Sequence, residues 1–271
     1  MMQRLVLAVL FLLAFGAGPA AAQTCTLTDT SMNFGTYTGA LLNGTSNGTV
    51  TCSSSWDIPL NAGTGAGATE TIRKMTGPGG AELSYQVFQD AARTINWGNT
   101  TSTDLNGTGN ANITFYGQII AGQYVVPGTY TDTLSTATTN FSVTATVLKD
   151  CGVTATNMAF GTYTRTVATS TSTITVTCTN TTTYTVGLSA GLATGATVTA
   201  RKMQNGAALL NYGLFSNATW TTNWGNTSAT NWVSGTGNGA AQPLTVYGQI
   251  PAGQYVTPGS YTDTITVNVT Y

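Results

Sequence analysis

The four cysteines are the side chains in this sequence best placed to do chemistry, and their spacing indicates disulfide bonds. Cys25 and Cys52 lie 27 residues apart, and Cys151 and Cys178 repeat that spacing. In an exported chain, a repeated pair of this kind predicts one disulfide within each copy. A metal site is the alternative. Because the sequence has no histidine and no CxxC motif, we expect no metal ion.

Acidic side chains are the next candidates, because paired carboxylates can act as general acid and base. Asp132 and Asp263 stand at matching places before the last strand of each half, which favours a structural turn or capping role. Glu70, Glu82 and Asp90 occur only in the first half. They are candidates for lining a ligand site, with solvated loop charge as the alternative. Without histidine the usual catalytic triads are unavailable, so we expect neither an enzyme nor a bound cofactor.

The first 22 residues have the character of a secretory signal. Arg4 precedes an apolar run from Leu5 to Phe15, and three alanines end the segment before Gln23. The run is too short to favour a membrane span, and no later segment is apolar enough to cross a bilayer. We therefore expect residues 1–22 to be removed and the mature chain to be exported.

Charge is sparse in the whole chain. Eight Lys and Arg face nine Asp and Glu, for a formal net charge of −1. No basic field exists for nucleic acid or anionic lipid. The repeated pairs Arg73-Lys74 and Arg201-Lys202 are candidates for meeting a partner protein or a substrate, although such pairs are usually solvated strand ends.

After the signal, the chain is a near-complete internal duplication. Residues 25–37, which end in Asn-Phe-Gly-Thr-Tyr, return at 151–163 with the ending Ala-Phe-Gly-Thr-Tyr. The motif Tyr-Gly-Gln-Ile at 116–119 returns at 247–250. We expect two domains joined by a segment that has no counterpart in the duplication: residues 23–140, residues 149–271, and the joining segment 141–148.

Short alternating runs separated by Gly, Asn and Pro clusters predict antiparallel β-sandwiches. Thr171–Cys178 is one such run, rich in β-branched residues that suit a pleated, half-buried surface. The last strands of the two halves differ. Tyr261–Tyr271 alternates cleanly and predicts a full strand, whereas Tyr130–Asn140 loses its alternation after Leu134 and predicts only a partial one.

The order Cys…Phe-Gly-x-Tyr…Trp-Gly…Tyr-Gly-Gln-Ile…Gly-x-Tyr-x-Asp-Thr, present twice, resembles the spore coat protein U domain family. That family includes pilins and tip adhesins of archaic, Csu-like chaperone–usher pili. The resemblance implies an all-β chain of two tandem immunoglobulin-like antiparallel β-sandwiches, the second lacking its final strand. In such pili a periplasmic chaperone first fills the gap. The N-terminal strand of the next subunit then replaces it, which is donor-strand complementation.

The joining segment fits this mechanism. Phe141, Val143, Ala145 and Val147 share one apolar face, as a strand filling an apolar groove requires. We expect it to act as a donor strand and to pair with the sheet of the first domain. The first domain has no donor of its own before Cys25, so the resemblance implies a subunit at the distal end of a fibre.

The resemblance therefore implies a two-domain tip subunit of a pilus at the cell surface. Its partners would be a periplasmic chaperone, an outer-membrane usher and sister pilins. The second function class is a secreted spore-coat-like or biofilm matrix protein with self-sufficient sandwiches. Five residues of the first domain are candidates for binding a surface, with core or turn packing as the alternative: Leu41, Leu42, Trp56, Ile58 and Leu60.

Overall fold

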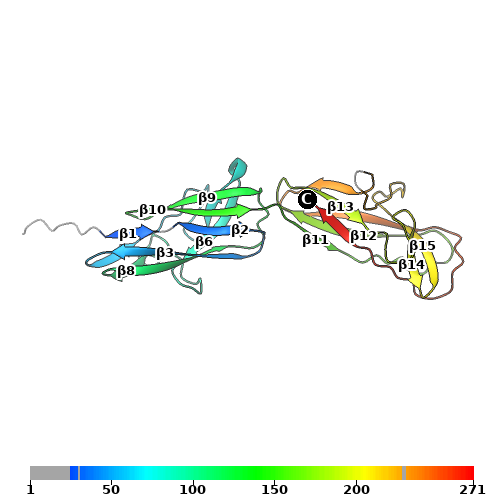
Figure 1. The fold of residues 1–271 in the computed structure, drawn as a ribbon, viewed down its shortest axis with the longest axis horizontal. Coiled ribbons are helices and arrows are strands. Elements are labelled where there is room, and N and C mark those ends of the chain that lie inside the picture. The colour runs from blue at the N-terminus through cyan, green and yellow to red at the C-terminus, as the bar shows by residue number, and fades with distance from the viewer. Residues whose placement is uncertain (1–24, 30, 228–229) are drawn as a thin grey trace, which may run out of the picture.

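The computed structural model describes residues 25–29, 31–227 and 230–271, so the expected signal, residues 1–22, lies outside the described residues. Two β-domains lie end to end (Figure 1). Apart from one 3-10 turn, η1 (Pro78–Gly80), every regular element in the described ranges is a strand. The prediction of an all-β chain with two tandem domains is confirmed.

One curled sheet forms most of the first domain. Its strands follow in spatial order: β1 (Thr26–Asp29), β3 (Leu42–Thr51), β8 (Ala111–Ile119), β6 (Glu82–Phe88), β5 (Arg73–Thr76), β9 (Gly128–Ser135), β10 (Asn140–Val147) and β2 (Met32–Tyr37). A pair of strands, β4 (Ser55–Ile58) and β7 (Leu105–Thr108), completes the domain.

The sheet curls so that β2, at one end of the strand order, packs against β3 and β8 near the other end, and two glycines make room for this contact. A Cβ at Gly44 of β3 or at Gly117 of β8 would approach the Phe34 ring of β2 to 2.9 and 2.6 Å. Glycine at both positions therefore lets β2 close over the sheet.

The second domain has two sheets, of five and three strands. The larger contains, in order, β11 (Cys151–Ala155), β12 (Ala168–Cys178), β17 (Ala241–Ile250), β15 (Ala208–Phe215) and β14 (Arg201–Asn205). The smaller contains β16 (Val233–Thr236), β13 (Thr183–Leu188) and β18 (Val267–Thr270). Each domain has its own core, in which Trp97 and Trp224 are buried at matching positions.

The last strands contradict the expectation drawn from their alternation. The first domain contains the full-length strand β9 and then β10, whereas the second contains only the four-residue β18. Residues 261–266 form one described β-bridge, between Thr262 and Gln204, and no longer ladder. Alternation makes a segment suitable for a sheet, but a strand also needs a neighbour to pair with. In the first domain β10 is that neighbour.

Among the described residues, every ladder is antiparallel except one. β10 pairs antiparallel with β9 and parallel with β2, where Val143 lies opposite Met32 and Val147 opposite Tyr37. The prediction of antiparallel sandwiches is therefore confirmed for all described ladders except this one.

The cysteines pair within domains. The structure joins Cys25 to Cys52 and Cys151 to Cys178, each across a sequence separation of 27. In the second domain the two cysteines lie opposite each other at the start of β11 and the end of β12.

Removing one bridge should destabilise its own domain. We expect the double substitution of Cys25 and Cys52 by serine to lower the free energy of unfolding of the first domain by roughly 3 kcal/mol, because loop closure no longer restricts the unfolded chain. Hydrogen–deuterium exchange read peptide by peptide would show the loss. Peptide mapping under non-reducing conditions would check the pairing, and a bridge between domains would contradict it.

Candidate strand-accepting groove

β10 completes the first domain by lying between β9 and β2. Its ladder with β9 runs from Asn140, opposite Ser135, to Val147, opposite Gly128. Four alternate side chains of β10 point into the core, and none is more than 3% exposed: Phe141, Val143, Ala145 and Val147. This strand therefore contributes one whole face to the core of the first domain.

Phe141 is the largest of these four side chains and packs among aromatic rings. Its ring is stacked on Trp97 at 6.2 Å between centroids and lies 5.3 Å from the ring of Phe115. Aromatic pairs at such distances contribute beyond their buried area. The start of β10 is therefore anchored to the core of the first domain by aromatic packing.

No described residue of the second domain occupies the place that β10 takes in the first. Met158, Phe160 and Tyr163 are the counterparts of Met32, Phe34 and Tyr37 of β2. The three residues in the first domain are buried, whereas their counterparts are half-buried and lie outside any strand. Tyr130, buried in β9, likewise corresponds to the half-buried Tyr261. The residues that flank β10 in the first domain are thus repeated in the second domain, where they are more exposed.

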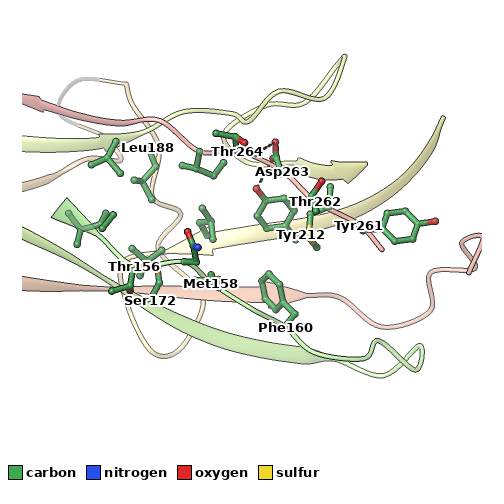
Figure 2. A pocket seen from close by; sticks show the side chains of 18 residues that line it. Thr156, Met158, Phe160, Ser172, Leu188, Tyr212, Tyr261, Thr262, Asp263 and Thr264 are labelled. Carbon is green, nitrogen blue, oxygen red and sulfur yellow. Dashed lines mark hydrogen bonds between the residues drawn. The ribbon is translucent and has the colours of Figure 1, made fainter. Parts of the chain in front are cut away.

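A cavity of about 510 Å³ lies between two walls in the second domain (Figure 2). Met158 and Phe160 stand on one side of it, and Tyr261 to Thr264 on the other. Its floor is apolar and comes from several strands: Ile174, Leu188, Met203, Leu214 and Val246. Its apolar floor is of a kind that suits the alternating apolar side chains of an extended strand.

Two polar side chains, Tyr212 and Asp263, are hydrogen-bonded to each other in the cavity lining. The Tyr212 hydroxyl donates a hydrogen bond of 2.7 Å to Asp263 Oδ2, and the Leu192 amide donates one of 2.8 Å to Asp263 Oδ1 (Figure 2 shows Tyr212 and Asp263). Burial, together with this bond to Asp263, raises the pKa of Tyr212 far above its usual range. The hydroxyl therefore remains a donor, and the carboxylate holds the loop that begins at Leu192.

The first domain repeats this pair with Asp132. Its carboxylate accepts from the Tyr85 hydroxyl at 2.7 Å and from the Thr64 amide at 2.7 Å. Gly63 is required beside it, because its φ is +85° and a Cβ would meet the carboxylate. Asp132 and Asp263 therefore act as structural caps, and they lie in different domains.

The sequence had suggested that both basic pairs are solvated strand ends, but their arginines, Arg73 and Arg201, are buried, whereas Lys74 and Lys202 remain half-buried. Arg73 is fully buried, and its guanidinium donates to the carbonyls of Asn61, Glu70 and Trp97 at 2.9, 2.6 and 2.6 Å. Arg201 repeats the arrangement in the second domain. Burial lowers the pKa of Arg73 to about 10, so the side chain is charged at neutral pH. Its charge is met by carbonyl dipoles.

Three of the five candidate surface residues lie in the core instead. Trp56, Ile58 and Leu60 are at most 8% exposed, because β4 turns this face inward and the indole of Trp56 donates to the Gly109 carbonyl. The proposal that they bind a surface is wrong.

Leu41 is exposed and Leu42 is half-buried, but neither lies at the distal end of the first domain. Leu41 belongs to the connection after Gly39, and Leu42 is the first residue of β3. The Gly39 carbonyl accepts a hydrogen bond from the Gly122 amide. The loop of Gly122 also contains Tyr124, whose carbonyl accepts from Asn180 of the second domain. Leu41 and Leu42 therefore lie at the end that faces the second domain.

Glu70, Glu82 and Asp90, the three first-domain candidates for a ligand site, bind loop backbone. Glu70 Oε2 accepts from the Asn99 amide, Glu82 Oε1 from the Ala66 amide, and Asp90 Oδ1 from the Ile95 amide. These contacts indicate loop positioning rather than a ligand site. Within the described part of the chain, no group of three acidic, cysteine or histidine side chains is arranged to hold a metal ion. None of its helices is long and apolar enough to span a membrane.

The sequence analysis implied a missing strand in the second domain, but it did not identify the residues that border the gap. Among the residues that line it are Met158, Phe160 and Tyr261, and each resembles an ordinary core residue in the sequence. The available signal was the duplication: each of these residues has a counterpart in β2 or β9, the two strands that flank β10 in the first domain.

Comparison with known proteins gives a family and a fold. A model of the Spore Coat Protein U domain matches residues 11–136 and again residues 137–268. Protein U of Myxococcus xanthus is 37% identical over 155 residues, which span 51% of this chain and 86% of that protein.

One solved structure shows the same fold. A chain in the crystal structure of the CsuC–CsuE chaperone–tip adhesion subunit pre-assembly complex, from the archaic chaperone–usher Csu pili of Acinetobacter baumannii, matches with a TM-score of 0.53. The match is 18% identical and covers 92% of this chain and 100% of that chain. The CupB6 tip adhesin from Pseudomonas aeruginosa matches with a TM-score of 0.32 and 11% identity, over 92% of this chain and 94% of that one. The latter likeness is too low to carry an argument.

Proposed function

We propose that this chain, which belongs to the spore coat protein U domain family, is an exported subunit of a chaperone–usher pilus. Its second domain accepts a strand from another polypeptide by donor-strand complementation. One observation carries the proposal: the second domain repeats the walls that hold β10 in the first domain, and a cavity of about 510 Å³ lies between them. The fold shared with a chain of the Csu pre-assembly complex supports the same role.

The asymmetry of the two domains supports a position at the tip. β10 is joined to β9 by a short hairpin, so the first domain is filled by a strand of its own chain. A domain filled in this way needs no strand from a neighbour. The first domain would then be the distal, adhesive module, and the second would bind the chaperone first and the next pilin afterwards. The usher and the cell-surface location belong to the same proposal.

A strand supplied in cis should stabilise the second domain. We expect fusion of a flexible linker and a copy of residues 140–147 after Tyr271 to convert a poorly soluble or oligomeric chain into a stable monomer. The reason is that an open apolar groove and unpaired edges favour association. Sedimentation velocity and thermal unfolding would measure the change.

The matched control carries the same linker followed by the same eight residues in scrambled order. If the unfused chain is already a monomer whose second domain melts cooperatively, and the fused strand adds nothing, the pilus proposal is wrong. The second candidate, a secreted coat or matrix protein with self-sufficient domains, is then favoured. The family match and the likeness to Protein U are its support.

A further inference from the structure

The unpaired edge of the second domain is longer than the edge that β10 covers in the first. In the first domain the chain turns back after β9, where the Thr136 amide donates to the Thr139 carbonyl at 2.9 Å, and continues as β10. The matching residues of the second domain do not turn. They continue as β18, which pairs with β13 and lies at the edge of its three-stranded sheet.

The alternation of the wall continues along this extra length. Ile265, Val267 and Val269 are half-buried and pack against the core, whereas Asn268 between them is exposed. Val267 also lines the cavity, together with residues 155–157 on the facing side. The cavity therefore reaches beyond Ile265 to Val267, and the apolar alternation of its wall continues to Val269.

The register of β10 shows how an incoming strand would meet this edge. Phe141 lies opposite Leu134, whose counterpart is Ile265. In an antiparallel ladder, the residue two places before the Phe141 position then lies opposite Val267, and the residue four places before it lies opposite Val269. In the first domain these two places fall within the turn of residues 136–139, where no such contact can form.

We infer that the second domain takes a longer strand than β10, from another polypeptide that carries two further apolar side chains, two and four residues before the position equivalent to Phe141. This inference rests on the proposed function and specifies the partner. The partner segment is extended, with six alternate apolar positions where β10 has four. Its later positions meet the same wall residues as β10 does, since Met158, Phe160 and Tyr261 repeat Met32, Phe34 and Tyr130.

The direction of the strand follows from the same register. β10 runs toward the junction and leads through three residues into β11. A strand bound in the same direction would start beside β18 and end near residues 251–259, at the far end of the second domain (Figure 1). A module that follows this strand is then placed head to tail with the second domain. The added contacts fall on the side of the domain junction.

Three labelled peptides added to the full chain test the inference by fluorescence anisotropy. The first copies residues 140–147. The second adds Val-Thr-Val before this copy, which places valine opposite Val267 and Val269, and the third adds Ser-Thr-Ser instead. We expect the valine peptide to bind at least ~10-fold more tightly than the serine peptide, because two apolar side chains become buried.

Two variants of the chain locate the effect. Val269→Ser should reduce the advantage of the valine peptide and leave binding of the first peptide unchanged, whereas Asn268→Ser, on the exposed face of the same strand, should change neither. If the first peptide binds and the valine and serine peptides bind equally, the longer strand is excluded and the proposed function stands. If none of the three binds, both are overturned.

Discussion

Replacing Arg73 by methionine is expected to lower the free energy of unfolding of the first domain by about 4 kcal/mol or more, since each buried polar group left unpaired costs about 1–3 kcal/mol. The guanidinium of Arg73 satisfies the carbonyls of Asn61, Glu70 and Trp97 from a fully buried position. Methionine fills a similar volume but donates no hydrogen bond. Hydrogen–deuterium exchange with peptide mapping would report each domain separately.

The chain offers two controls for this substitution. Lys74→Met removes the neighbouring charge, whose ammonium makes one exposed hydrogen bond to the Ala66 carbonyl, and should cost less than about 1 kcal/mol. Arg201→Met repeats the loss of hydrogen bonds in the second domain and should leave the first domain unchanged. An Arg73→Met chain as stable as the parent would show that water or rearranged loops satisfy the three carbonyls equally well.

Phe141→Ala should destabilise the first domain by roughly 3–5 kcal/mol, the cost of truncating a large aromatic side chain in a packed core. Phe141 is 3% exposed and its ring meets Trp97 and Phe115, so its loss leaves a cavity that two fixed rings border. The second domain should keep its own stability. Thermal unfolding combined with hydrogen exchange over residues 25–135 and 151–271 would separate the two effects.

Thr146→Ala is the matched control, because Thr146 lies on the exposed face of the same strand. Its effect should stay within about 0.5 kcal/mol. If Phe141→Ala lowered the stability of the second domain alone, β10 would belong to the second domain and the proposed assignment of the two grooves would have to be reversed.

Arg73→Met tests a feature that both domains share, and Phe141→Ala tests a feature that only the first domain has. Each domain has a buried arginine that ties loops to its core, and this feature is repeated without change. Only the first domain has β10, and this difference sets the two domains apart. The proposed function depends on the difference, and the stability of the common framework depends on the repeat.

Features that depend on short stretches of chain, or on the duplication, were predictable from the sequence. Alternation with a period of two indicated strands and the inward face of 141–147, because successive side chains of a strand point to opposite sides. The all-β class and the two domains followed from this alternation and from the repeat.

Only the tertiary structure decided which segments obtain neighbours. Residues 261–266 alternate well, yet they form no ladder beyond the bridge at Thr262, because pairing requires a second strand that the sequence pattern of the segment cannot supply. Arg73 reads as a solvated charge until loops from residues 60–98 bring their carbonyls around it. Trp56 reads as a candidate for a binding surface until β4 turns it inward. In each case the residues that decide the outcome are distant in the sequence. The same holds for the groove, which is lined by residues near the start and near the end of the second domain's sequence.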